Sequence, residues 1–153
     1  MQGLLCDIYG LYSEQVDLLD GFLALSRRKT EIIRAGSPED LDRLIRAEEA
    51  LLMQLSRVES KRRKALEMLR NELSLPAPVS MKDLGRLLGS EDIARFEELS
   101  KRFTDTVHKQ RRCNRLNKKL LGAKIEAANR VLNVLDRGRA KGDEVRTILD
   151  MKG

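Results

Sequence analysis

Apolar residues recur at alternating intervals of three and four along the chain, and this spacing predicts long helices. The first stretch covers residues 2–35, and two polar residues, Gln15 and Lys29, interrupt its apolar stripe. A repeat of this kind is typical of helices that pack side by side along their length. The stripe consists of Leu4, Ile8, Leu11, Gln15, Leu18, Phe22, Leu25, Lys29 and Ile32.

The second predicted helix covers residues 38–74, and its start has the sharpest local signal in the chain. Ser37 precedes a proline and two acidic residues. The serine can cap free backbone amides, proline suits the first helical position, and acids favour the positive end of the helix dipole. Gly36 offers a C-terminal cap for the first helix. Because the connection is short, we expect an antiparallel helical hairpin.

The remainder of the chain predicts a third long helix and a tail. A Pro-Ala-Pro segment ends the second helix, because proline cannot continue it. We expect a short helix at about residues 81–88 and a long helix over 91–136, with Gly138 as its stop. The domain organisation is then a helical bundle over residues 1–138 and a mobile amphipathic tail over 139–153.

Composition agrees with an all-α fold, an elongated antiparallel three-helix bundle. The chain has 153 residues, of which 41% are apolar, 35% are charged and 3% are aromatic. So few aromatic residues argue against an all-β fold, and the plentiful apolar residues argue against disorder. No apolar stretch approaches the roughly 20 residues of a membrane span. The N-terminus lacks a basic start and a long apolar region, so we expect no signal peptide.

Signals for catalysis or metal binding are weak, so we expect no enzyme, no cofactor and no metal site. The single histidine, His108, has no cysteine or aspartate at metal-ligand spacing, and no glycine-rich phosphate loop is present. Polar residues do occupy nominal core positions. They fit a polar layer that fixes helix register, with Lys29 and Glu48 close enough to pair, or the active site of an all-helical mutase. These residues are Gln15, Lys29, Glu48, Arg62, Gln110, Asn114 and Asn117.

Positive charge is concentrated in the last half of the chain. The net charge is +6, and the run 101–124 contains nine basic residues and one acid, Asp105. This basic stripe suits a solvated helix face, an acidic protein partner, or the phosphate backbone of a nucleic acid, although no aromatics interleave with it for base stacking. The stripe consists of Lys101, Arg102, Lys109, Arg111, Arg112, Arg115, Lys118, Lys119 and Lys124.

Two segments together resemble a known family. The first segment lies in the second predicted helix. It consists of residues 41–52, Leu-Asp-Arg-Leu-Ile-Arg-Ala-Glu-Glu-Ala-Leu-Leu, followed by a stretch that leads to Arg-Arg-Lys-Ala-Leu at 62–66. Residues 114–121 read Asn-Arg-Leu-Asn-Lys-Lys-Leu-Leu, an Asn-x-x-Asn-x-x-Leu-Leu pattern. In this order, in an all-helical chain, they resemble the FlgN family of flagellar export chaperones over about residues 4–137.

The resemblance implies a cytosolic chaperone without catalytic activity. Such chaperones bind the C-terminal helical segment of hook-associated proteins, prevent premature assembly and deliver them to the type III export apparatus. The C-terminal part of the chain is implied to bind the partner. The residues implied for binding are Val131, Leu132, Leu135, Val145, Ile148 and Leu149. The family-motif positions, which we interpret as interior structural residues, are Asn114, Asn117, Leu120 and Leu121.

The sequence also leaves alternatives open. Many family members have a tyrosine shortly before a glycine near the C-terminus, and no tyrosine precedes Gly138 here. Apolar residues such as Leu52, Leu66 and Leu120 leave open whether the bundle is a monomer or a homodimer. The main functional alternative is a helical nucleic-acid-binding protein that uses the basic stripe.

Overall fold

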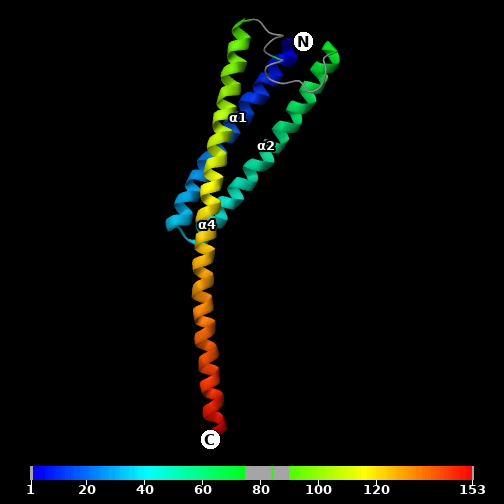
Figure 1. Ribbon diagram of the computed structural model, residues 1–153. Coiled ribbons are helices and arrows are strands. Elements are labelled where there is room, and N and C mark those ends of the chain that lie inside the picture. Colours follow the sequence, from blue (N-terminus) through cyan, green and yellow to red (C-terminus); the bar gives the residue numbers. More distant parts are fainter. Residues whose placement is uncertain (1, 75–83, 85–89, 153) are drawn as a thin grey trace.

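In the part of the chain that it describes, the computed structural model of the protein contains three long helices (Figure 1). It describes the backbone of residues 2–74, 84 and 90–152, and the side chains of 3–74, 84 and 92–137. Helix α1 spans Gln2–Ala35, α2 spans Pro38–Leu73 and α4 spans Ser90–Lys152. All described elements are helices, which confirms the all-α class. Apart from Leu84, the short helix expected at residues 81–88 lies outside the described residues.

The hairpin between α1 and α2 is fixed by the capping residues at its tip. The Ser37 hydroxyl accepts a hydrogen bond from the Asp40 amide at 3.2 Å, and the Asp40 carboxylate accepts one from the Ser37 amide at 3.5 Å. This reciprocal capping box satisfies backbone donors that the first turn of α2 leaves without helical partners. The Gly36 amide donates to the Ile32 carbonyl at 2.7 Å and closes the last turn of α1.

Helix α1 is the central helix, and both other helices pack along it. Helix α2 runs antiparallel to α1, so that Lys29 meets Glu48 near the tip while Tyr12 meets Arg62 farther along. Helix α4 runs parallel to α1, from the Tyr9–Phe96 ring contact to a hydrogen bond between Thr30 and Asn117. The Cα atoms of α2 and α4 nowhere come within 8 Å of each other among the described residues. Among the described residues, α2 and α4 are therefore joined through α1 and the shared core rather than by close backbone contact.

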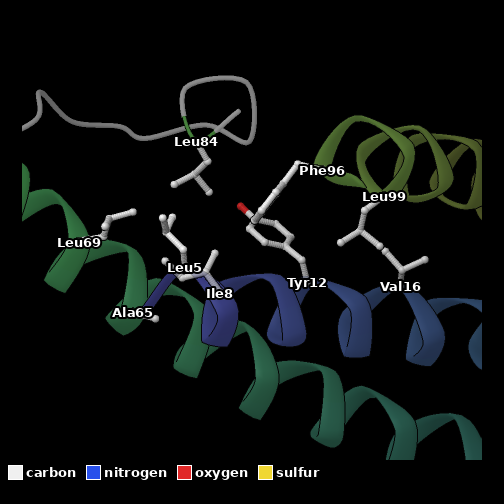
Figure 2. Close-up of a cluster of buried hydrophobic side chains, with 9 residues drawn as sticks. All are labelled: Leu5, Ile8, Tyr12, Val16, Ala65, Leu69, Leu84, Phe96 and Leu99. Atoms are coloured by element: carbon white, nitrogen blue, oxygen red, sulfur yellow. The ribbon is translucent and has the colours of Figure 1, made fainter. Parts of the chain in front are cut away.

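The main core lies at the end of the bundle near the N-terminus. Figure 2 shows that α1 contributes the side chains at its centre, while α2, α4 and Leu84 cover it from different sides. Ile8, Val16, Leu69 and Leu84 are fully buried. The hydrophobic effect therefore holds this end of the bundle together most strongly. The cluster consists of Leu5, Ile8, Tyr12, Val16, Ala65, Leu69, Leu84, Phe96 and Leu99.

The expected end of the third helix at Gly138 is wrong, because α4 continues through this glycine to Lys152. A glycine inside a helix costs about 1 kcal/mol relative to alanine, which a run of good helix formers tolerates when no proline follows. Residues 139–141, Arg-Ala-Lys, are such helix formers. At 1.5 Å per residue, the 63 residues of α4 measure about 95 Å. The mobility of residues 139–153 stays a prediction.

Candidate partner-binding site

Helix α4 extends far beyond the helix on which it packs. Thr30 of α1 contacts Asn117 of α4, and α1 ends five residues later at Ala35. Since the two helices run parallel with the same rise per residue, α4 extends past the end of α1 from about residue 122 onward. Figure 1 shows the rest of α4 standing alone, away from both α1 and α2.

Among the described residues, an apolar stripe along α4 continues past this point without a partner. Leu121, Ile125, Ala128, Leu132 and Leu135 follow one another at intervals of 4, 3, 4 and 3. We name these five residues the free seam. Leu121 is half-buried, whereas Ile125, Leu132 and Leu135 are 59%, 55% and 59% exposed. An exposed heptad stripe of this kind is complementary to the apolar face of another helix.

The residues that the sequence predicted for partner binding fall partly on this surface. Leu132 and Leu135 belong to the free seam, and Val131 lies exposed at its edge. The side chains of Val145, Ile148 and Leu149 lie outside the described residues, although their backbone belongs to α4. Ile125 was missed by the sequence reasoning. The 4-3-4-3 spacing that starts at Leu121 is the signal that identifies it.

A polar layer joins α1 to α4 directly before the free seam. Asn117, 4% exposed, donates from Nδ2 to the Ser26 carbonyl at 2.8 Å and accepts a hydrogen bond from the Thr30 hydroxyl. Gln110 Nε2 donates to Ser26 Oγ at 2.7 Å. These contacts fix the axial position of α4 relative to α1, because a shift of one residue breaks all of them.

The two asparagines of the family motif differ in their surroundings. Asn117 is buried, as the structural interpretation expected, but Asn114 is exposed and its expected interior position is wrong. Its side chain lies at the edge of the interface and accepts a hydrogen bond from Gln110 Nε2 at 2.9 Å. Leu120 and Leu121 are both half-buried at the end of the layer.

The polar residues on the other side of α1 hold the hairpin together. Lys29 Nζ lies 3.3 Å from Glu48 Oε2, which confirms the predicted pair. Arg62 stacks over the Tyr12 ring at 4.7 Å and donates to the Tyr12 hydroxyl at 2.7 Å, a contact that the apolar stripe did not reveal. These contacts support a structural polar layer.

One hollow of about 460 Å³ lies near the N-terminal end of α1, and its lining residues are Gly3, Leu5, Cys6, Tyr9, Asp92, Arg95 and Phe96. None of the polar residues named above lines this hollow.

The basic stripe of α4 divides into two parts. Arg102 forms ion pairs with Asp20 at 3.0 Å and with Asp17 at 3.4 Å. The hydrogen bonds to Asp20 and Asp17 raise the pKa of the Arg102 guanidinium above its ordinary value. Farther along α4, five of the exposed basic side chains lie within residues 111–119. We name them the basic patch: Arg111, Arg112, Arg115, Lys118 and Lys119.

The described part of the chain also bears on metal binding and on membrane insertion. Across residues 3–74, 84 and 92–137, no group of three or more histidine, cysteine or acidic side chains is placed to hold a metal ion. Within the described helices, none is long and apolar enough to cross a membrane.

Comparison with known proteins identifies the family. The FlgN protein family matches residues 1–145, nearly the whole chain and all of the surfaces described above. Neither the curated proteins nor the solved structures contain a match. The family match covers both segments that carried the sequence resemblance, including the Asn-x-x-Asn-x-x-Leu-Leu motif. The chain therefore belongs to the FlgN family, a family of flagellar export chaperones.

Proposed function

We propose that this protein is a cytoplasmic chaperone that holds the C-terminal helical segment of a hook-associated protein on the free part of α4. The observation that supports this most strongly is the free seam, an apolar stripe that α1 covers up to about residue 121 and then leaves open. A bound helix would take the place of α1 along the rest of the stripe. Residues 121–135 offer two heptads, about 21 Å of helix, for this contact.

The strength of such a complex follows from the apolar side chains that it buries. Full burial of one leucine or isoleucine contributes about 1.5–3 kcal/mol, and the free seam contains three such residues that are more than half exposed. Association and ordering consume part of this gain, so the affinity is moderate. A moderate affinity suits a chaperone, because the substrate must be released to the export apparatus. A complex of moderate affinity can dissociate without mechanical force or nucleotide hydrolysis.

Covering the substrate helix also explains how premature assembly is prevented. A substrate segment that packs into a helical assembly after export exposes its apolar face before export. The free seam covers this face with side chains of the same kind. Delivery to the type III export apparatus then requires a surface of the chaperone that the substrate leaves uncovered.

The test measures binding of a fluorescent peptide that corresponds to the C-terminal helical segment of a hook-associated protein from the same organism. Leu132→Asp places a charge in the middle of the free seam, and we expect it to weaken binding at least tenfold, about 1.4 kcal/mol. Val134→Asp is the matched control. Val134 is also apolar and exposed, at 67% against 55% for Leu132, but two residues along the helix place it on nearly the opposite side from the seam.

The control is expected to bind the peptide within about twofold of the unchanged chain. Equal binding by all three proteins would contradict the proposal, and so would an equal loss in both variants. Sedimentation of the free chain examines the homodimer. A dimer that dissociates in Leu132→Asp and not in Val134→Asp would show that a second copy, rather than an export substrate, occupies the seam.

A further inference from the structure

The basic patch lies on the face of α4 that points away from α1. Gln110, Cys113 and Asn117 face α1, since each lies within hydrogen-bonding distance of Ser26 or Thr30. Arg111, Arg112 and Arg115 fall between them in sequence, Lys118 and Lys119 follow Asn117, and all five patch residues are exposed. At 3.6 residues per turn they share one side of the helix, over about 12 Å of its length. No acidic residue occurs between Asp105 and Glu126.

Among the described residues, the charges of the basic patch are not paired with carboxylates. Arg102 and Lys29 are paired with carboxylates, and Arg46, Arg63 and Arg130 each have an acidic neighbour one turn away on the same helix. Within the described residues, none of the five patch side chains has an ion pair. Five like charges within nine residues of one helix repel one another, which lowers the stability of the helix. Their concentration therefore points to a ligand of opposite charge.

The shape of the patch favours an acidic protein over a nucleic acid. Single strands are held by aromatic side chains in a basic groove, and the patch is a convex helix face without aromatics.

The limits of the patch lead to the same conclusion. Asp105 lies before it and Glu126 after it along α4, so a continuous polyanion that followed the helix would meet repulsive charges at both ends. A short acidic helix, by contrast, carries its charges over a limited length. Carboxylates at intervals of 4 and 3 on such a helix match the spacing of Arg111, Arg115 and Lys118.

We propose that the basic patch is a second docking surface, which binds an acidic surface helix of a partner protein. The patch and the free seam occupy different faces and different lengths of α4. A partner on the patch therefore leaves the seam available, and the two partners can be bound at the same time. The inference does not depend on the identity of the ligand in the seam.

The experiment uses the full chain and a fluorescein-labelled alanine-based helical peptide with glutamates at intervals of 4 and 3. The same peptide with glutamine in place of glutamate is the uncharged probe. In 50 mM salt we expect the acidic peptide to bind and the glutamine peptide not to bind. R111E/R115E/K118E is expected to weaken binding of the acidic peptide at least tenfold, and 300 mM salt to weaken it in the unchanged chain.

The matched control is R57E/K61E/K64E, which changes the net charge by the same amount with the same 4-3 spacing on an exposed face of α2. It is expected to bind the acidic peptide within about threefold of the unchanged chain. L132D serves as a second control, and we expect it to leave this binding unchanged. Circular dichroism verifies that every variant keeps its helix content. All substituted positions of the two triple variants are exposed, so none removes a buried contact.

Three results would overturn the proposal. An equal loss in both triple variants would mean that net charge alone attracts the peptide. Equal binding of the glutamate and glutamine peptides would remove the charge argument. Tighter binding of a labelled 20-base-pair DNA duplex than of the acidic peptide, lost in R111E/R115E/K118E and kept in R57E/K61E/K64E, would assign the patch to nucleic acid.

Discussion

At the scale of single residues, buried polar side chains determine how α4 is placed on α1. An apolar interface tolerates sliding, because leucine and valine pack adequately in more than one register. Asn117 removes this freedom, since its donor and its acceptor groups both need partners on α1 at one position. The position of the free seam relative to the end of α1 therefore depends on this residue.

Asn117→Ala is expected to lower the free energy of unfolding by about 1–3 kcal/mol, since it removes two buried hydrogen bonds and leaves the Ser26 carbonyl with one partner fewer. Asn114→Ala is the control, because Asn114 is exposed and its loss is expected to cost less than about 0.5 kcal/mol. Urea denaturation followed by circular dichroism measures both. Equal effects of the two substitutions would contradict the role assigned to the polar layer.

The sequence predicted some of these residue contacts and not others. The Lys29–Glu48 pair followed from the short hairpin, because the turn fixes which residues of the two helices face each other. The different surroundings of Asn114 and Asn117 did not follow, since both lie on the apolar stripe of α4. The distinction depends on which side of the stripe lies against α1, and the spacing of a stripe does not show that.

At the scale of elements, glycines lie in different surroundings in this chain. Gly36 follows the end of α1 without a left-handed backbone, since no described glycine has a positive φ. Glycine is favoured there because the backbone of Ile32 lies very close to it. A Cβ atom there would lie 2.8 Å from the Ile32 carbonyl oxygen. Gly122 lies inside α4, where an added Cβ would meet nothing within 4 Å. Gly138 also lies inside α4, which continues through it to Lys152.

These surroundings predict opposite effects for the same substitution. Gly36→Ala is expected to destabilise the protein by about 1–3 kcal/mol, because the new methyl group overlaps the backbone of the preceding turn. Gly122→Ala is expected to stabilise it by about 0.5–1 kcal/mol, because alanine has the higher helix propensity and the site is open. Thermal unfolding measures both. A stabilising Gly36→Ala would contradict the close approach at the hairpin.

The starts of the helices were easier to predict from the sequence than the end of α4. Ser37 and the residues after it form a capping box with a specific chemistry, and the structure has it. Gly138 was expected to stop the helix because glycine is common after helix ends. Ending a helix, however, requires the backbone to be turned and its last carbonyls to be satisfied, and a single glycine between good helix formers provides neither.

At the scale of the whole molecule, the protein consists of a helical bundle and one long projecting helix. The all-α class followed directly from the heptad spacing, since the same pattern extends over three long stretches. The projection did not follow, because apolar periodicity shows that a face needs a partner without showing whether the partner is in the same chain. For the free seam, the partner is absent from the described part of the chain, and this is why it is a candidate binding site.

The most direct test of this account is hydrogen exchange of the full chain with and without the C-terminal helical segment of a hook-associated protein. In the free chain, we expect fast exchange beyond residue 122, because in the part of the chain that the structure describes this stretch of α4 extends past the end of α1 and lies away from α2. With the segment bound, we predict strong protection of residues 121–137, extending to the predicted contacts at 145–149. Protection confined to α2, or unchanged exchange along α4, would contradict the binding site proposed on the free seam.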